Sequence, residues 1–423
     1  MSKLIHSTLE KICLPEKGSI ISGPFGSNIS SKYFVASGIP VIRGNNLSLT
    51  YDKFYDDGFV FVTPEKAEEL KCYAIRGDLI FTAAGTLGQV GIIPQNSIYD
   101  TYVISNKQIR ARLDSGKIDL LYAFYWFSSP WIQKILKNNN KGSTVPLLTL
   151  AEVKSLPIVY PESLEEQRRI AKCIDEFSLK IENNNAINDN LAQQAKLLYD
   201  YWFTQFDFPD ENNKPYRSSG GKMEWNDRIK RNIPTGWHVV TFTNIATWES
   251  NSQPPKSEFR YEPQDGYVRF IQNRDYDSNA HKTYIPLTKN LSIVDRLDIL
   301  MDKYGDAGAV RYGIEGAFNV ALGKINVHNT SHREYIRSYL ESDGIYTYLH
   351  NSCMASTRAS LSESNLANLI LVMPDDVTIA KYEAILNNIR KRILKNNDEI
   401  EKLVELRDWF LPLLMNGQAT IAE

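Results

Sequence analysis

The feature that most constrains this chain is an internal repeat, because two halves with one pattern predict two copies of one domain. The segment GSTVPLLTLAEVKSLPIVYP, which ends at Pro161, aligns without gaps with ASTRASLSESNLANLILVMP, which ends at Pro374. Upstream, GDLIFTAAGTLGQVG matches LDILMDKYGDAGAVR, and the paired residues are Asp78 with Asp298, Gly85 with Gly305, Gly88 with Gly308 and Val90 with Val310. At 423 residues the chain is long enough for two such domains, each with a core of its own.

Each repeat begins with short β-type runs, such as PVIRGNNL and YVRFIQNRDY, and ends in a long helical stretch. The first helix is expected to start after Pro161, where Ser163 and Glu166 have the spacing of a capping box. Apolar residues then recur at steps of three and four, with Asn184 and Asn188 in a gap of the series: Ile170, Ile174, Phe177, Ile181, Leu191, Ala195, Leu198 and Trp202. This pattern predicts a coiled-coil seam with a polar break.

The second helix is expected to begin near Asp376 and to end at Gly417, with Pro412 distorting its last turns. Its seam is predicted to consist of Ile385, Ile389, Ile393, Asn396, Ile400, Leu403 and Phe410. A first helix from Ser163 to about Phe206 would be roughly 65 Å long. Because a helix of that length cannot be buried in one small domain, each helix needs the other as its partner.

We therefore predict an α+β fold in which two mixed α/β domains are separated by two long antiparallel helices that form a coiled coil, with pseudo-twofold symmetry. The segment 208–236 is polar and rich in Pro, Gly and Ser, which indicates a linker. The predicted boundaries are domain one at 1–161, the first helix at 162–207, the linker at 208–236, domain two at 237–374, the second helix at 375–417 and a tail at 418–423.

Composition limits the class of protein. The formal net charge is only -2, so any binding of nucleic acid must use local patches or be shared with partners. The four cysteines lie far apart without a CxxC spacing, which favours free thiols over a zinc site or a disulfide framework. No apolar run could cross a bilayer and the first residues do not resemble an export signal, so we expect a cytoplasmic protein that does not contact a membrane.

Four segments, in order, make the chain similar to the specificity subunits of type I restriction-modification enzymes. They are SGPFGSNI (Ser22–Ile29) with SGIPVIRGNNL, LEEQRRI (Leu164–Ile170), YDYWFTQFDFPDENNKPYRSSGGKMEW (Tyr199–Trp225) with IPTGW, and LRDWFLPLLMNGQ from Leu406. The second half departs from the pattern, because it has ESNSQPPK in place of GPFGS and TIAKY (Thr378–Tyr382) at the start of its helix. Two target-recognition domains of different subtypes are therefore expected.

The resemblance implies a DNA-binding subunit without catalytic activity and without a cofactor of its own. Each target-recognition domain would read one half of a split, asymmetric site on double-stranded DNA. The helices would act as a spacer and as a docking surface for two modification subunits, which carry the methyl donor and flip out the target adenine. Separate restriction subunits would supply translocation and cleavage, and the complex would serve in defence against phage.

Two other functions stay open at this point: a diverged DNA methyltransferase or nuclease fusion, and a coiled-coil adaptor with no role at DNA. The chain lacks the usual marks of an enzyme. Gln253-Pro254-Pro255-Lys256 is not an Asn/Asp-Pro-Pro-aromatic loop, and the glycines at 85, 88 and 91 do not have the GxGxxG order. His328 and His332 have no HExxH partner, so no metal site is expected.

Direct reading of DNA needs Arg, Lys, Asn or Gln on loops that can enter the major groove, with hydroxyl groups nearby to hold phosphates. In domain one the candidates are Arg43, Asn45, Asn46, Thr86, Gln89, Lys141, Ser143 and Thr144. In domain two they are Gln272, Asn273, Arg274, Lys303, Tyr304, Ser356, Thr357 and Arg358. Recurrence at equivalent places in the two halves is the reason for choosing them.

Overall fold

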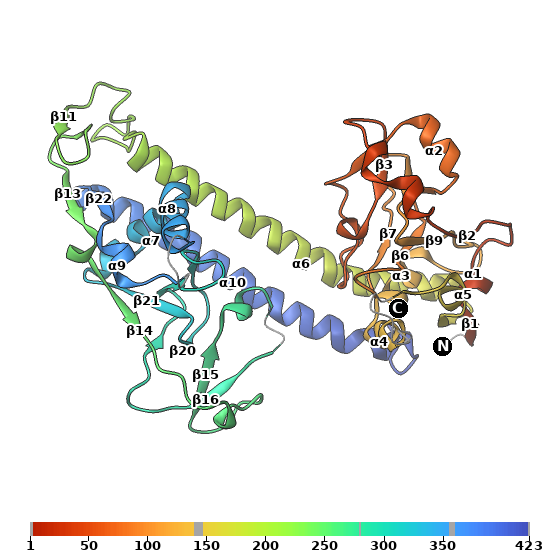
Figure 1. Ribbon diagram of the computed structural model, residues 1–423. Helices are drawn as coiled ribbons and strands as arrows, with labels where there is room; N and C mark the ends of the chain where they lie inside the picture. The colour runs from red at the N-terminus through yellow and green to blue at the C-terminus, as the bar shows by residue number, and fades with distance from the viewer. Residues whose placement is uncertain (1–2, 139–146, 279–280, 355–359, 422–423) are drawn as a thin grey trace. The chain divides into compact units, whose positions relative to one another are not determined.

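The computed structural model describes residues 3–138, 147–278, 281–354 and 360–421. The chain forms two compact units, residues 1–183 with 399–423 and residues 184–398 (Figure 1). Both long helices pass from one unit into the other. Among the described residues, no helix is apolar over a stretch long enough to span a bilayer.

The first unit contains two four-stranded sheets and one two-stranded sheet. One four-stranded sheet has the order β2 (Ile20–Ser22), β9 (Gln108–Ala111), β6 (Leu79–Thr82), β7 (Val90–Ile92). The other has the order β4 (Val60–Val62), β3 (Ile39–Ile42), β8 (Thr101–Ile104), β5 (Tyr73–Ile75). The two-stranded sheet pairs β1 (Leu4–Thr8) with β10 (Pro157–Pro161). All pairs are antiparallel except β3 with β8, whose register sets Val41 opposite Val103.

The second unit repeats this topology strand for strand. Its four-stranded sheets have the orders β14 (Ala246–Ser250), β21 (Leu322–Val327), β18 (Ile299–Asp302), β19 (Val310–Arg311), and β16 (Tyr284–Pro286), β15 (Tyr267–Ile271), β20 (Gly316–Phe318), β17 (Ile293–Val294). The pair β13 (His238–Thr241) and β22 (Ile370–Met373) corresponds to β1 and β10. Here too the one parallel pair is the central one, β15 with β20. The duplication predicted from the sequence is therefore a duplication of fold.

Short helices complete each unit, and the last three of the first unit occur in the same order in the second. In the first unit they are α1 (Leu9–Ile12), α2 (Pro64–Leu70), α3 (Leu120–Ser128), α4 (Pro130–Asn138) and α5 (Leu150–Lys154). In the second they are α7 (Arg333–Glu341), α8 (Asp343–Met354) and α9 (Glu363–Ala367). Helix α3 is almost entirely apolar and is buried between the sheet and the long helices, because Tyr122, Phe124 and Phe127 are fully enclosed. Burial of such rings, at about 25 cal/mol per Å² of apolar surface, is the main source of stability here.

The first long helix, α6 (Leu164–Tyr199), continues as a π-helical turn, η4 (Asp200–Thr204). Ser163 caps it by accepting a hydrogen bond from the Glu166 amide at 3.4 Å. Gln167, from the segment LEEQRRI, is fully buried and fixes the helix start: its Nε2 donates to the Pro161 carbonyl at 2.8 Å and its Oε1 accepts from the Asp119 amide at 2.7 Å. The second long helix, α10 (Asp376–Met415), continues through Pro412, and Gly417 follows it with a φ of 67°.

Within each unit the two long helices run antiparallel. In the first unit the Phe177 ring stacks on Phe410 with centroids 6.1 Å apart, and Lys180 pairs with Glu399 at 2.5 Å. In the second unit the predicted polar break is a hydrogen-bonded layer. Asn396 Nδ2 donates to Asn188 Oδ1, and Asn188 Nδ2 donates to Asn397 Oδ1, both at 2.8 Å.

The predicted seam of α10 is wrong at its start. Ile385 is 40% exposed, whereas Ile379, Tyr382 and Leu386 are buried in the core of the second unit. The reason is that this end of α10 packs against α7 and the aromatic end of α6, so its buried face is set by the domain and not by the helix pair. Further along, Ile393 and Asn396 are buried as expected.

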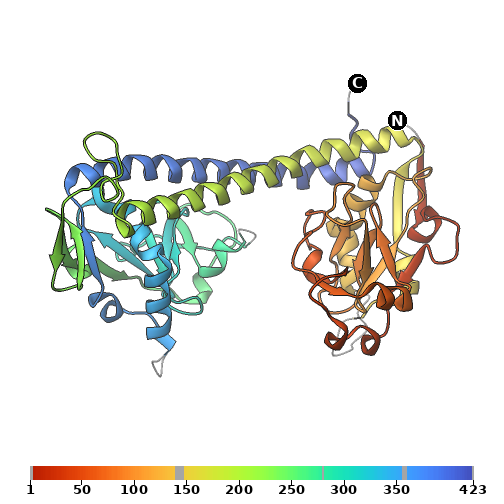
Figure 2. The ribbon, with the colours of Figure 1, turned by 90° about the horizontal axis from the view of Figure 1, so that it is seen from above.

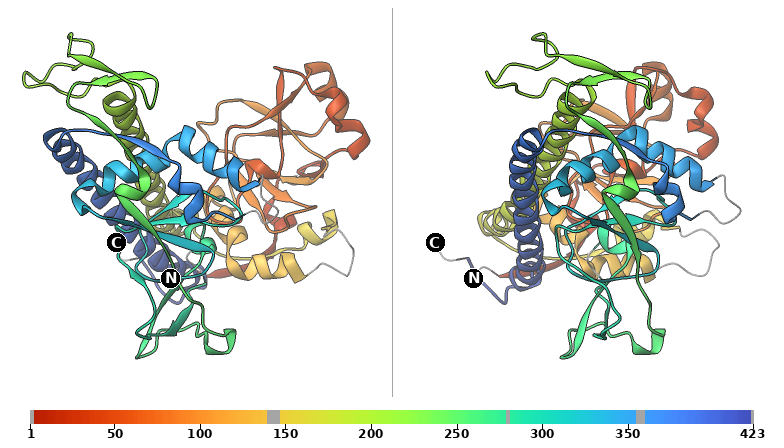
Figure 3. Two further views of the ribbon diagram at one scale, coloured as in Figure 1. Left: turned by 60° about the vertical axis from the view of Figure 1, so that its left-hand side comes forward. Right: turned by 90° about the vertical axis from the view of Figure 1, so that its left-hand side faces the viewer.

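The segment 208–236, expected to be a linker, contains ordered structure. It forms a hairpin of β11 (Met223–Asn226) and β12 (Arg231–Pro234), which projects beyond the end of α6 (Figure 3). Before the hairpin, the Phe208 ring is stacked between Tyr216 and Trp237, with centroids 4.6 and 4.7 Å away. The polar composition of the segment predicted a linker. It gave no sign of this packing, because only a few aromatic residues provide it.

The two ends of the described chain lie in the first unit, side by side (Figure 2). Leu411, Leu414 and Met415 of α10 enter the core of this unit, and Ile5 of β1 packs against the same core. Each domain is also tied to the helices of its own unit by ion pairs: Lys53 with Asp175 at 2.6 Å in the first, and Arg296 with both oxygens of Asp398 at 2.8 and 2.9 Å in the second.

Candidate nucleic-acid interface

Three connections of the first unit meet beside the central parallel strand pair. They are the turn η3 (Gly44–Asn46) after β3, the loop after β6, and the turn between β8 and β9. In η3 the Arg43 amide donates to the Asn46 side-chain oxygen at 3.0 Å, which closes the turn directly after the strand. The other two connections are joined by a backbone hydrogen bond from the Ala83 amide to the Lys107 carbonyl at 2.7 Å. The sheet thus fixes where the side chains of these loops can point.

Gln89 holds two of these connections together. Its Nε2 donates to the carbonyls of Gly44 and Leu47 at 2.9 and 3.1 Å, and its Oε1 accepts from the Thr82 hydroxyl at 3.0 Å. The amide group is therefore used inside the protein. In this structure Gln89 positions η3, and its contact with DNA stays a prediction.

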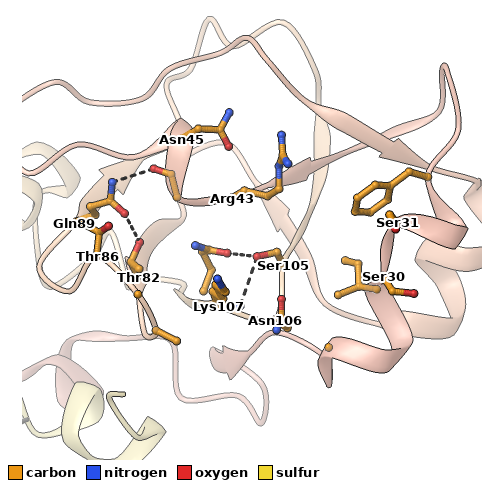
Figure 4. Close-up of a pocket in the computed structure, with 17 residues that line it drawn as sticks. Ser30, Ser31, Arg43, Asn45, Thr82, Thr86, Gln89, Ser105, Asn106 and Lys107 are labelled. Atoms are coloured by element: carbon orange, nitrogen blue, oxygen red, sulfur yellow. Dashed lines mark hydrogen bonds between the residues drawn. The ribbon is translucent and has the colours of Figure 1, made fainter. Parts of the chain in front are cut away.

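The connections enclose an open pocket of about 690 Å³ (Figure 4). Its lining brings together the predicted residues Arg43, Asn45, Thr86 and Gln89. The remaining lining residues are Gly26, Ile29, Ser30, Ser31, Phe34, Gly44, Thr82, Ala84, Gly85, Ser105, Asn106, Lys107 and Gln108. Two cations, several hydroxyl and amide groups and no carboxylate make up this lining, which suits a ligand with anionic oxygens and hydrogen-bonding edges.

Lys107 and its neighbours Ser105 and Asn106 were not among the residues predicted from the sequence. Lys107 is exposed at the pocket, and among the described residues no carboxylate lies within ion-pair distance of its ammonium. A signal was available, since Ser-Asn-Lys stands between the two β-type runs TYVI and QIRA, where a tight turn is expected. Ser30 and Ser31 belong to the segment that follows GPFGS, but the pattern did not show that they face the same pocket.

Gln108 adds a buried polar group to the pocket. Its side chain is 1% exposed and its Oε1 accepts from the Ser105 hydroxyl. Its Nε2 is buried and has no hydrogen-bond partner among the described residues. An amide donor left without a partner beside a pocket costs free energy unless a ligand or water completes it.

Arg43 and Asn45 lie on the outer side of η3. Arg43 Nη2 and Asn45 Nδ2 both donate to the Gly58 carbonyl, at 3.1 and 3.3 Å, and Asn45 is exposed. Asn46 is different, because its side chain is fully buried and its Nδ2 donates to the carbonyls of Tyr55 and Asp57 at 2.9 and 2.8 Å. Asn46 therefore shapes the loop from inside, and its contact with DNA stays a prediction.

The glycines after β6 serve different purposes. Gly85 has a φ of 93°, lines the pocket and has open space where a side chain would be. A Cβ on Gly88, whose φ is 95°, would fall 2.2 Å from the Gln133 side-chain oxygen. Glycine at position 88 is thus needed for the close approach of this backbone to the Gln133 side chain.

The described predicted residues of the second unit, at positions 272–274, 303 and 304, lie at the equivalent connections. Asn273, in the turn η7 (Asn273–Tyr276) after β15, donates from Nδ2 to Asp302 Oδ1 at 2.9 Å, which joins η7 to the end of β18. Asp302 also accepts from Arg311 at 2.8 and 3.1 Å, and burial raises the pKa of its carboxyl group. Gln272 Nε2 donates to the Thr283 hydroxyl at 3.0 Å. The side chains of Gln272 and Asn273 therefore form internal hydrogen bonds, and their contacts with DNA stay predictions.

Arg274, Lys303 and Tyr304 are the outward members of this second set. The Arg274 side chain is 56% exposed and Tyr304 is 51% exposed. Lys303 Nζ donates to the Ser250 hydroxyl at 2.9 Å and lies 5.5 Å from the centre of the Trp248 ring. Burial lowers the pKa of its ammonium group, and no acidic partner within the described ranges offsets that cost.

Six predicted residues lie outside the described part of the chain: Lys141, Ser143, Thr144, Ser356, Thr357 and Arg358. The histidines at 328 and 332 form hydrogen bonds within the second unit. His328 Nδ1 bonds with the Asn244 carbonyl at 3.2 Å, and His332 Nε2 bonds with Asn329 Nδ2 at 3.0 Å. Within residues 3–138, 147–278, 281–354 and 360–421, no group of three or more His, Cys, Asp or Glu residues is placed to hold a metal ion.

Comparison with known proteins places this geometry in context. The family model for the type I restriction modification DNA specificity domain matches the chain twice, over residues 19–193 and 234–404. The type I restriction enzyme MjaIX specificity subunit of Methanocaldococcus jannaschii is 24% identical over 366 residues, which cover 82% of this chain and 79% of that protein. The HindI specificity subunit of Haemophilus influenzae is 21% identical over 403 residues, with coverage of 81% and 86%.

A crystal structure of the type I restriction-modification S subunit from M. genitalium has a similar fold. It superposes with a TM-score of 0.60 at 14% sequence identity and covers 98% of this chain and 96% of that one. One family match falls on each of the two repeats, residues 19–193 on the first and residues 234–404 on the second.

Proposed function

The chain belongs to the type I restriction modification DNA specificity domain family, and from that premise we propose that it reads a bipartite, asymmetric site on double-stranded DNA, one half with each domain. The proposed target-recognition domains are residues 1–161 and 237–374. The segments 162–207 and 375–417 are proposed as the spacer helices, and 208–236 and 418–423 as the connection and tail.

One observation carries this proposal. An equivalent backbone hydrogen bond joins two loops in each unit. In the first unit the Ala83 amide, after β6, donates to the Lys107 carbonyl, before β9. In the second unit the Lys303 amide, after β18, donates to the Ala321 carbonyl, before β21. Each pair contains one lysine, but the lysine stands on opposite partners of the bond. The two domains therefore share one backbone scaffold but carry different side chains on these two loops. Such a difference suits two unlike half-sites.

The outward residues of the two domains would divide between phosphates and bases. We assign Lys107 and Lys303 to phosphates, because a compact ammonium group on a turn neutralises charge without reading sequence. We assign Asn45 with Thr86, and Arg274 with Tyr304, to base edges. An arginine that is mostly exposed can make the paired contact with guanine that specifies a base.

Within the complex the chain would have no catalytic role. Two modification subunits would dock on the long helices and supply the methyl donor and the adenine-modifying site, and restriction subunits would supply translocation and cleavage. The chain itself would bind no cofactor and would act in the cytoplasm. Titration of the isolated chain with the methyl donor S-adenosylmethionine tests this directly: no binding is expected, and saturable binding would support a methyltransferase instead.

The experiment for half-site reading uses the complex of this chain with its modification subunit. Arg274→Ala is expected to weaken binding by about 1–3 kcal/mol through the half-site that the second domain reads. Asn45→Ala, in the first domain, is the matched variant and should affect the other half-site. Binding is measured on duplexes in which one half-site at a time is scrambled, and equal losses from both halves would contradict the assignment.

A further inference from the structure

Phe25 is the most exposed large apolar side chain in the described parts of the chain. It is 84% exposed, whereas six other phenylalanines of this domain pack into its cores or against them and Phe61 contacts the Tyr99 ring. A single exposed apolar residue is not unusual by itself. What distinguishes Phe25 is that the surrounding backbone is fixed and that the surroundings are polar.

The backbone around Phe25 is held against the turn between β8 and β9. The Gly23 amide donates to the Gln108 carbonyl at 2.9 Å, and a Cβ on Gly23 would fall 1.8 Å from the Ser105 carbonyl oxygen. On the other side, the Phe25 carbonyl accepts from the Asn28 amide at 2.8 Å in the turn η1 (Gly26–Ile29). The ring is therefore presented from an ordered segment, and glycine at position 23 is required for this close packing.

The neighbours of this segment are the cationic pocket residues. Gly26 lines the pocket directly after Phe25, and a Cβ there would lie 3.1 Å from the Asn106 side-chain nitrogen. Lys107 follows Asn106 in the same turn. Since the lining contains lysine and arginine and no carboxylate, the ring stands beside a surface that attracts phosphates.

We propose that Phe25 makes an apolar contact with a base in the half-site read by the first domain, and this inference rests on the proposed function. Proteins use such rings in two ways, as wedges against a base face and as partners of the thymine methyl group. The second domain has Gln253, Pro254 and Pro255 in the corresponding segment before its turn η6 (Lys256–Glu258), so it lacks the ring. The effect of Phe25 is therefore confined to one half-site.

The test uses the full chain assembled with its modification subunit and a duplex that carries the split motif recovered from methylated genomic DNA. Phe25→Ala is compared with Phe25→Tyr, which keeps the ring, and with Ile98→Ala. Ile98 is 71% exposed in the same domain but does not line the pocket, so it is the matched control. Thermal unfolding and assembly with the modification subunit are measured for each variant.

Phe25→Ala is expected to weaken binding to the intact motif by roughly tenfold, with normal unfolding and assembly. Phe25→Tyr and Ile98→Ala should bind like the unaltered chain, and scrambling the half-site of the first domain should abolish the difference. Two further duplexes, altered in the half-site of the first domain, identify the mode of contact. In one, 2-aminopurine replaces a base, and a rise in its fluorescence on binding indicates that the ring acts as a wedge. In the other, uracil replaces thymine, and weaker binding indicates a contact with the methyl group.

Unchanged binding by Phe25→Ala would overturn the inference, as would a loss of assembly, which would make Phe25 a protein contact. An equal loss on scrambled duplexes would also overturn it, because a base contact depends on the base. If the unaltered complex does not recognise a split motif at all, the proposed function itself fails, and that result is distinct from a failure of Phe25 alone.

Discussion

Neighbouring residues in η3 have opposite roles, and this difference can be measured. Asn46 is buried with its amide bonded to two backbone carbonyls, while Asn45 is exposed beside the pocket. Asn46→Ala leaves those carbonyls without a partner, so we expect it to lower the free energy of unfolding by about 1–3 kcal/mol. Asn45→Ala should change it by less than about 0.5 kcal/mol. Urea unfolding of the two variants checks this, and similar values for both would contradict the placement of Asn46.

Lys107 should act on DNA without regard to sequence. Lys107→Gln removes one phosphate contact, so the slope of the logarithm of affinity against the logarithm of salt concentration should fall by about 1. Affinity should decrease by the same factor on specific and random duplexes. The measurement is a titration between roughly 50 and 200 mM salt. An unchanged slope, or a loss limited to the specific duplex, would argue that Lys107 reads a base.

Glu383 should make the stability of the second unit depend on pH. Burial raises the pKa of its carboxyl group to about 7 in the folded chain, above the ordinary value of 4.5. The folded chain therefore keeps this proton where the unfolded chain has lost it, so stability falls as pH rises from about 4.5 to about 7. Glu383→Gln keeps an oxygen for the Tyr335 amide and removes the titration. The free energy of unfolding of Glu383→Gln, measured with urea, should exceed that of the unaltered chain by about 1–3 kcal/mol at about pH 8. A difference that does not change with pH would refute this prediction.

The candidate residues could be predicted from the sequence only as far as local patterns reach. A strand followed by Arg43, Gly44, Asn45 and Asn46 indicates a polar turn after a strand. Which of these side chains faces outward depends on the carbonyls at positions 55–58, and their position is set by the strand β4 that follows. Lys107 was missed for the same reason, since its loop meets the β6 loop only through sheet pairing.

The polar layer between the long helices is the feature of the elements that is most open to test. Asn396 is 3% exposed and donates to Asn188, so Asn396→Ala removes a buried hydrogen bond and should cost about 1–2 kcal/mol. Replacing both Asn188 and Asn396 with Leu should instead stabilise the pair, with less strict register. Urea unfolding gives the free energy of unfolding of both variants. If the variant with Leu at both positions is less stable than Asn396→Ala, the asparagine layer is needed for packing.

The helices were predictable and the sheets were not. Steps of three and four along one stretch identify a helix without knowledge of the rest of the chain, and α6 begins at Leu164, next to the predicted capping residue. Strand order depends on contacts between distant segments, such as Val41 with Val103. The exposed Ile385 shows the limit of periodicity, because the domain packed against that end of α10 selects a different face.

At the scale of the whole molecule, one fold occurs twice, and the two copies differ in the side chains of their loops. The strand orders are the same in the two units, but the lysine at the backbone hydrogen bond between the two loops moves from the β8–β9 turn to the loop after β18. The exposed ring of Phe25 also has no counterpart in the second half. Duplication of the scaffold with divergence of its loops is what recognition of an asymmetric site requires.

The most direct measurement is a genome-wide map of methylated adenines in a host that carries the modification subunit, with this chain present, absent or altered at Arg274. We predict a split motif of two unlike halves that depends on the chain. In the Arg274→Ala strain, one half should lose its stringency while the other is unchanged. Methylation that persists without the chain, or a single continuous motif, would contradict the claim that the two domains read two half-sites.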